Sequence, residues 1–279
     1  MERMHLLINN YDMTQNYGVC ICKGTIENLL AYPEFKKLKS NDWFEHDCVE
    51  YDLSAPKFKN KNAVLNLQSR SNAWNLINDI VYGGDGYGSI SVPQIELSFS
   101  KVRYNRGTKS NVFEGLYEYS LEFIIDDVPF ASYTPSQIVT ANPTEPITMD
   151  SVNLASYGIK VLNGWKGEMA KMPQLKQPMT RDIEIENSVI CDHYAHNGSM
   201  YYSDMSFDCL ISGGTSQQVI EKYRRFFYAL TRPNKRAFTF SSNDCMVQYG
   251  FYKNVKVTEF INGNRAWLRF TLTLTAQES

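Results

Sequence analysis

The sequence predicts a mainly β protein, built from two tandem copies of an antiparallel β-sandwich or barrel domain with one flanking α-helix per domain. Three observations lead to this prediction. The chain of 279 residues is long enough for two domains of ordinary size. Tyr and Phe, which favour strands, supply 18 and 15 residues. Most tellingly, a set of residues recurs at a constant separation of 140 positions.

The recurrence covers the beginning of each half. Tyr17-Gly18 is matched by Tyr157-Gly158, and Gly24 is matched by Gly164. Further pairs at the same separation are Pro33 and Pro173, Phe35 and Leu175, Lys36 and Lys176, Asp42 and Asp182, Val19 and Ile159, and Ile21 and Val161. Several matches at one separation indicate an internal duplication.

Beyond that stretch the separation drifts, but the order of expected elements is kept. In the first copy we expect a strand at 63–67 and a helix at 72–82, with Ser71 as N-cap. A strand at 95–99 follows, and the alternation over 117–123 predicts a closing strand with one buried face. The apolar side of the helix consists of Trp74, Ile77 and Val81.

The second copy repeats this order. We expect a strand at 205–210, a helix at 215–230 and strands at 237–240 and 267–275. Thr215 or Ser216 is the expected N-cap, and Pro233 stops the helix. The apolar stripe of this helix consists of Val219, Tyr223, Phe226, Phe227 and Leu230.

Three segments follow from this division. Residues 1–126 form the first β domain and residues 150–279 the second. Residues 127–149 are rich in proline and lack a sustained period, which is typical of a linker. Residues 102–112 are expected to be a loop, either an interface arm or a mobile one.

Composition excludes several classes of protein. The 28 basic and 30 acidic side chains leave a formal net charge of −2, which argues against a dedicated, sequence-specific nucleic-acid binder. No apolar window reaches the length of a membrane span, and the apolar run near residue 6 is too short for a signal peptide. The six cysteines are too scattered for a disulfide framework. Cys20 and Cys22 alternate with apolar residues, so both thiols are expected on one face of a strand.

Catalytic chemistry has little support. The run 83–88 is rich in glycine but follows a helix, which favours a plain loop over a phosphate site. Cys191, His193 and His196 are the one candidate metal site, because three zinc-type ligands stand within six residues. Asn197-Gly198 next to them favours a turn between strands instead. We therefore expect no enzyme activity and no cofactor.

The order of elements resembles the tail-tube fold of bacteriophages and related injection machines, in particular distal-tail and baseplate-hub proteins. The likeness is carried by the segment Tyr-Gly-Ile-Lys-Val-Leu-Asn-Gly-Trp at 157–165, the prolines that follow it, the helix ending in Leu-Thr-Arg-Pro at 230–233, and the terminal strand. The distal-tail family carries one such domain, often followed by a galectin-like one. The second tube-type domain expected here brings the chain nearer to hub proteins.

The resemblance implies a structural subunit of a virion tail, made in the cytoplasm of the bacterial host. Its partners would be copies of itself and other tail or baseplate proteins. A homotrimer would present six similar units with pseudo-six-fold symmetry, and a homohexamer is the competing assembly. In such a ring the sheets line the lumen through which DNA or an effector passes. Glu118 and Glu122 would then face the lumen; the alternative is an ordinary solvent-exposed strand face.

A second function stays open. Four tryptophans (Trp43, Trp74, Trp165 and Trp267) and many tyrosines could stack on sugar rings in a carbohydrate- or surface-binding β-sandwich. Trp74 on a helix face and Trp267 on the closing strand are better explained by packing. Bound zinc would favour an enzyme, and glycan binding by a monomer would favour the second function.

Overall fold

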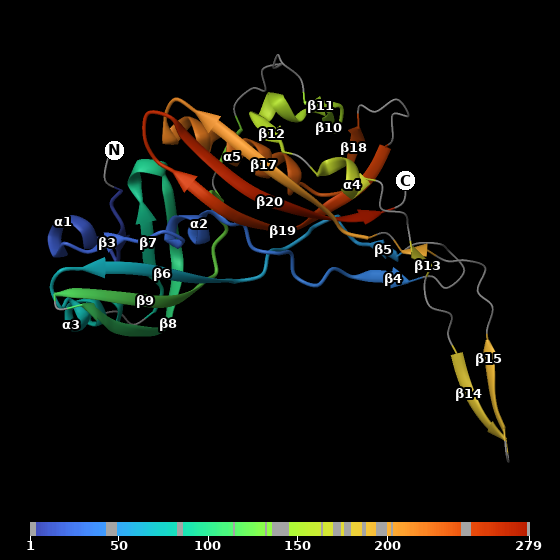
Figure 1. Cartoon of the computed structure of the whole chain (residues 1–279), viewed down its shortest axis with the longest axis horizontal. Helices are drawn as coiled ribbons and strands as arrows, with labels where there is room; N and C mark the ends of the chain where they lie inside the picture. The colour runs from blue at the N-terminus through green and yellow to red at the C-terminus, as the bar shows by residue number, and fades with distance from the viewer. Residues whose placement is uncertain are drawn as a thin grey trace.

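The fold consists of two large antiparallel sheets that are joined into one elongated molecule (Figure 1). The computed structural model describes residues 4–42, 49–82, 86–113, 115–131, 133–135, 145–162, 164–169, 174–175, 180–185, 188–193, 200–201, 203–240 and 247–277, without the side chains of 42, 169, 174–175, 180–185, 188–193 and 200–201. Each large sheet has seven strands. The predicted fold class, a mainly β protein with large antiparallel sheets, is confirmed, and each unit has more α-helices than the one expected.

The first sheet is built from residues 7–125, which we call the first unit. Its strand order is β2-β1-β7-β8-β9-β6-β3. The strands are β1 (Leu7–Ile8), β2 (Tyr11–Asp12), β3 (Cys20–Ile21), β6 (Lys61–Ser69), β7 (Gly88–Val92), β8 (Leu97–Phe113) and β9 (Leu116–Ile125). The helices are α1 (Met13–Tyr17), α2 (Thr25–Leu30), α3 (Trp74–Tyr82) and the short 3₁₀ helix η1 (Pro93–Ile95).

The second sheet is built from residues 147–277, the second unit. Its strand order is β11-β10-β18-β19-β20-β17-β12. The strands are β10 (Ile147–Met149), β11 (Val152–Asn153), β12 (Ile159–Val161), β17 (Met205–Gly213), β18 (Arg236–Phe240), β19 (Val247–Ile261) and β20 (Ala266–Gln277). The helices are η2 (Leu154–Tyr157), α4 (Trp165–Met169) and α5 (Ser216–Leu230).

The two strand orders correspond position by position, and so do local backbone features. The turn after β1 has φ of 50° and 67° at Asn9 and Asn10, and the turn after β10 has the same two values at Asp150 and Ser151. Gly18 and Gly158 both end a helix in the left-handed region, where a side chain would be strained. The residues that recur at a separation of 140 therefore occupy matching places in two sheets of one topology.

Each unit also carries a smaller set of strands, which lies between α2 and β6 in the first unit and between α4 and β17 in the second. In the first unit this segment, residues 31–59, is called the first arm; it contains the hairpin of β4 (Ser40–Asp42) and β5 (Val49–Tyr51) and a bridge between Phe35 and Phe58. In the second unit the corresponding strands are called the second arm. They are β13 (Gln174–Leu175), which pairs with β16 (Met200–Tyr201), and β14 (Thr180–Ile185), which pairs with β15 (Ser188–His193).

Several sequence predictions need correction. Residues 102–112 are not a loop, because they lie within the 17-residue strand β8 and pair with β9. The strand expected at 95–99 begins at Leu97, after η1. Helix α3 begins at Trp74 and not next to Ser71, and it buries Ile77 and Ile80 in place of Val81. These errors share a cause: exposed strands and short helices lack the one-sided burial that creates a sequence period.

The second half matches its prediction better. Thr215 is the N-cap of α5 and accepts a hydrogen bond from the backbone N of Gln218 at 3.3 Å. All five residues of the predicted apolar stripe are buried. Strand β19 is absent from the prediction, and the final three residues of the expected linker, Ile147–Met149, form β10 of the second sheet.

Lys61 links the first sheet to α2. Its ammonium donates to the carbonyl oxygens of Asn28, Leu29 and Ala31 at the C-terminal end of that helix. Burial lowers the pKa of Lys61 to about 7. The folded chain therefore holds fewer protons than the unfolded chain between about pH 7 and the ordinary lysine pKa of 10.5.

The free energy of unfolding should therefore rise with pH above about 7, by about 5 kcal/mol for the full shift of the Lys61 pKa. Urea unfolding from pH 7 to pH 10 measures it. In Lys61→Met, the contribution of Lys61 to the slope of the unfolding free energy against pH should vanish, while the contributions of the other titratable groups remain. Equal slopes in the two proteins would contradict the assignment to Lys61.

Candidate assembly surfaces

The first arm lies against the second unit and joins the two sheets. The ring of Tyr32 stacks on Phe227 of α5, with centroids 4.4 Å apart and planes 10° apart. The hydroxyl of Tyr223 donates to the Leu30 carbonyl at 3.0 Å, and that of Tyr252 donates to the Tyr32 carbonyl at 2.9 Å. Each buried tyrosine hydroxyl thus has a backbone acceptor in the other unit, which fixes the position of the arm.

A cluster of aromatic rings continues this contact on β19. Phe35 meets Tyr252 edge-on at 5.5 Å, and Phe58 packs on Phe35 at 4.9 Å. Farther along the arm, Tyr51 packs on Phe251 at 5.1 Å. Aromatic pairs at these separations add to the free energy of burying the rings themselves.

Polar contacts also join the first and second units. Glu27 accepts from the backbone N of Gly24 within α2 at 2.9 Å, and its second oxygen accepts from the backbone N of Phe260 in β19 at 3.3 Å. Arg224 of α5 pairs with Glu96 at 2.7 Å, and its guanidinium lies 4.6 Å from the ring centre of Phe130. One carboxylate and one guanidinium therefore each contribute to both units.

Helix α5 is consequently covered on two sides, whereas α3 is covered on one. Eight residues of α5 are buried, and Tyr223 and Phe227 among them contact the first arm. Helix α3 has the same place in chain order in the first unit, but only Ile77 and Ile80 are buried. Its outer side leaves Leu76 39% and Tyr82 66% exposed. The first unit thus presents an apolar helix face for which this chain provides no cover among the described residues.

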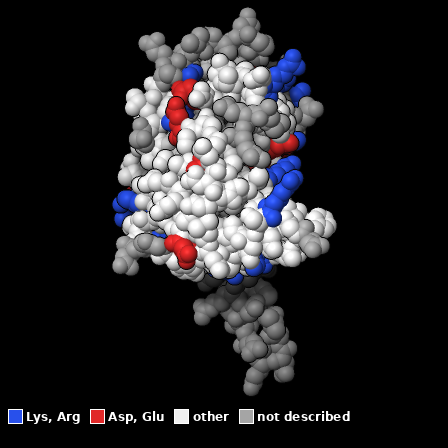
Figure 2. Space-filling model, turned by 90° about the vertical axis from the view of Figure 1, so that its left-hand side faces the viewer, with Lys and Arg blue, Asp and Glu red and all other residues white. Residues whose placement is uncertain are grey.

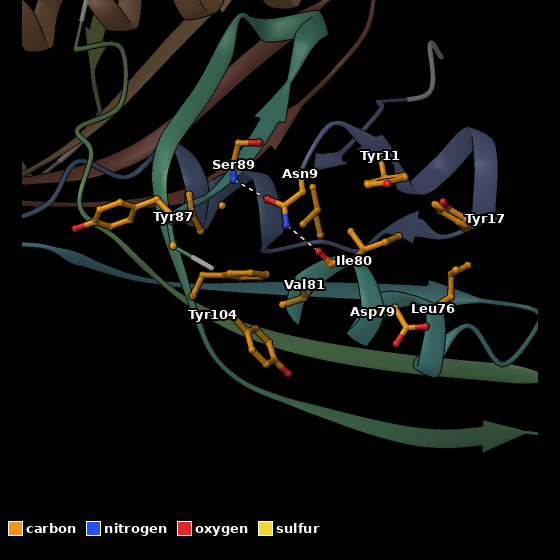
Figure 3. A pocket seen from close by; sticks show the side chains of 15 residues that line it. Asn9, Tyr11, Tyr17, Leu76, Asp79, Ile80, Val81, Tyr87, Ser89 and Tyr104 are labelled. Carbon is orange, nitrogen blue, oxygen red and sulfur yellow. Dashed lines mark hydrogen bonds between the residues drawn. The ribbon is translucent and has the colours of Figure 1, made fainter. Parts of the chain in front are cut away.

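A hollow of about 510 Å³ lies beside this helix face (Figure 3). Tyr11 and Tyr17 approach it from β2 and α1, and Leu76 approaches it from α3. Asn9 holds its wall in place: its side chain donates to the Ile80 carbonyl at 2.7 Å and accepts from the backbone N of Ser89 at 2.8 Å. Figure 2 views the end of the molecule where α1 and α3 lie, and the middle of that face carries few charged side chains. We call α3, the residues that line the hollow and residues 102–113 of β8 the α3–β8 surface.

The outward faces of both sheets are polar, with paired charges. Glu122 accepts from the guanidinium of Arg106 at 2.7 and 2.8 Å, and these hydrogen bonds lower its pKa. Glu118 accepts from the amide of Gln68 at 2.6 Å. In the second sheet, hydrogen bonds from Thr271 and then Arg269 lower the pKa of Asp208. Glu118 and Glu122 therefore lie on the face opposite the core, each with a partner on a neighbouring strand. Their position in a lumen stays a prediction.

The proposed metal ligands are only partly within the described residues. Cys191 and His193 lie in β15, opposite Asp182 and Thr180 of β14, but their side chains are not described, and His196 lies outside the described residues. Among the described side chains, no group of three His, Cys, Asp or Glu residues could hold a metal ion. No described helix is long and apolar enough to cross a membrane.

Other candidate residues are placed by packing. Cys20 lies in β3, and Cys22 follows it and donates its backbone N to Asn66 at 2.9 Å; both carry free thiols and are half-buried. Trp74 stacks on Tyr119 at 6.0 Å, and Trp165 stacks on Phe240 at 6.4 Å. Trp267 is half-buried in β20, and Trp43 lies outside the described residues.

Sequence reasoning missed the first arm as a functional element. The prolines and lysines of residues 33–39 suggest a loop, while the apolar residues Tyr32, Phe35 and Phe58 stand too far apart to form a period. The available signal was the repeat itself, since Phe35 is matched by Leu175 in the second half.

Comparison with known proteins adds little. No family model matches the chain, and no curated protein matches its sequence. Among solved structures, the Dit (gp 19.1) protein of phage SPP1, described as a paradigm of the hub adsorption apparatus in phages that infect Gram-positive bacteria, aligns over 99% of this chain and 100% of its own. The TM-score is 0.33 and the sequence identity 7%, values at which the likeness carries no conclusion about function.

The contact of Tyr32 with Phe227 predicts a large effect of truncation. Tyr32→Ala removes a buried, stacked ring and should lower the free energy of unfolding by about 3–5 kcal/mol. Chemical denaturation followed by near-UV circular dichroism measures this. Tyr228→Ala is the matched control, because Tyr228 of α5 is 43% exposed; its effect should stay within about 0.5 kcal/mol. Equal effects of the two changes would contradict a structural role for the arm.

Proposed function

We propose that this chain is a structural, non-catalytic subunit of a bacteriophage or prophage-derived tail. It assembles with copies of itself into a ring at the end of the tail tube or in the baseplate hub, and DNA or an effector passes through the ring. The chain acts there together with other tail proteins. The observation that carries the proposal is the pair of seven-stranded sheets with one strand order, held side by side by an arm of the first unit.

Two units in a head-to-tail contact are suited to a ring. The first unit uses its arm to contact the second, whereas no arm covers the corresponding surface of the first unit among the described side chains. Such a heterologous contact generates a closed ring if its rotation closes. Three chains would present six similar units, and six chains would present twelve. We favour the trimer, because its pseudo-six-fold arrangement fits a tube of six-fold symmetry.

The outward sheet faces support passage of a polyanion without retention. Their carboxylates are matched by arginines or amides, as for Glu122 with Arg106 and Asp208 with Arg269, so neither face concentrates positive charge through these pairs. A lumen lined by such faces would neither bind phosphates tightly nor repel them strongly.

The assembly prediction is tested with the whole chain. Size exclusion with light scattering should give a trimer, or a hexamer in the competing arrangement, and negative-stain images of the same peak should show rings with a central hole. A globular oligomer without a hole would contradict the proposed function.

The lumen assignment predicts an effect of charge reversal. Particles that carry Glu118→Lys together with Glu122→Lys should release DNA more slowly, because two positive charges per chain replace two negative ones on a neutral face. Glu50→Lys, on an exposed strand of the first arm, is the control for charge alone. Unchanged release by the double variant would remove both glutamates from the lumen.

A further inference from the structure

We infer that the second arm of one chain docks on the α3–β8 surface of a second copy of the same chain. The inference rests on the proposed function in one respect, since both require self-association. It goes further by naming the two surfaces that meet. It is drawn from the contact that the two units already make within one chain.

The first step is the equivalence of the two arms. In the first arm, Phe35 bridges to Phe58 and a two-stranded hairpin, β4–β5, lies between them. In the second arm, Leu175 pairs with Met200 and the hairpin β14–β15 lies between them. Phe35 and Leu175 are 140 positions apart, and so are Asp42 in β4 and Asp182 in β14. Both arms are thus the same structural element in two copies.

The second step is the equivalence of the two receiving places. Tyr104 of β8 pairs with Phe123 of β9, and Tyr252 of β19 pairs with Leu274 of β20. The pairing shifts register directly after Tyr104 in the first sheet and directly after Tyr252 in the second. Tyr104 therefore has the sheet position in the first unit that Tyr252 has in the second.

The two positions differ in what covers them. Tyr252 is fully buried beneath Phe35 of the first arm and donates a hydrogen bond to the Tyr32 carbonyl. Tyr104 is instead half-buried and lines the 510 Å³ hollow together with Ile80 and Val81 of α3 (Figure 3). The place that an arm occupies in the second unit is therefore an open hollow in the first.

The two units also differ at the outer edge of their longest strand, which in the described part of the chain is uncovered in β8 and covered in β19. Strand β7 pairs with β8 only as far as Val102, so the outer edge of residues 103–113 has no strand beside it among the described residues. The corresponding edge of β19 is met by α2, where Glu27 accepts from the backbone N of Phe260. An exposed strand edge of this length is normally covered in an assembled protein.

The position of the second arm in the molecule indicates that it comes to the α3–β8 surface from another chain. The hairpin β14–β15 lies away from both large sheets, at the end of the molecule opposite α1 and α3 (Figure 1). An arm at one end and its receiving surface at the other cannot meet within one chain. They meet when chains associate head to tail, and each new contact leaves one arm and one surface available until a ring closes.

The test uses two complementary variants of the whole chain. The receiving-surface variant carries Tyr11→Asp and Leu76→Asp, both at exposed side chains that line the hollow. The arm variant carries Leu175→Asp and Met200→Asp. Tyr228→Asp with Val247→Asp is the control, since these side chains of the second unit are 43% and 52% exposed and lie in neither surface. Sedimentation velocity measures assembly, and circular dichroism verifies the fold of each protein.

The wild type and the control should assemble alike. Each test variant alone should remain monomeric, or need at least about 100-fold more protein to assemble, because a carboxylate cannot be buried in an apolar contact without a partner. A 1:1 mixture of the two test variants should form a heterodimer and no larger species, since it retains one intact arm–surface pair. If the double substitution Tyr11→Asp and Leu76→Asp alters the fold, the single substitution Tyr11→Asp replaces it as the receiving-surface variant.

The outcomes separate the two proposals. Assembly of both test variants at wild-type concentrations would overturn the docking inference and leave the proposed ring intact. A mixture of folded variants that stays monomeric would overturn the head-to-tail pairing. A wild-type chain that remains monomeric up to millimolar concentration would overturn both the docking inference and the proposed function.

Discussion

The contact between Tyr32 and the two aromatic residues Phe227 and Tyr252 determines how the molecule is organised. It buries the stacked ring of the first arm on α5 and satisfies the Tyr252 hydroxyl with a backbone carbonyl of that arm. Because Lys61 holds the C-terminal end of α2, from which the arm departs, the first sheet and the arm are positioned together. The second sheet then packs on this arm, so two separate cores become one continuous apolar core.

The same contact makes the two units unequal. Both have one strand order, but α5 is buried on two sides and α3 on one. The difference shows in composition: α5 carries Tyr223, Phe226 and Phe227 where it meets its own sheet and the arm, and α3 is shorter and exposes Leu76. Two units of one strand order, joined through the first arm, leave the α3–β8 surface without an arm among the described residues, and the inferred head-to-tail association rests on this asymmetry.

Charge plays a different role from apolar burial here. The outward carboxylates of both sheets are held by neighbouring strands, which lowers the pKa of Glu122 and of Asp208 and keeps them ionised at neutral pH. Because these groups are exposed or nearly so, the pairs contribute little to stability. Their effect is to keep a broad sheet face polar without a strong net charge. The end of the molecule with α1 and α3 instead exposes Leu76 and Tyr82 and carries few charged side chains in the middle of its face (Figure 2).

The sequence by itself determined the duplicated order of elements, the alternating strands β6, β9, β17 and β20, and the Thr215 cap of α5. These features leave local signals, because one-sided burial produces a period and a cap needs a specific side chain. Strand β8 left none: most of residues 103–113 are exposed on both faces, so no alternation arises. Only the tertiary structure decided that Tyr32 and Phe35 bind the second unit and that Tyr104 lines an open hollow. Such pairings join residues some 200 positions apart, and no local pattern encodes them.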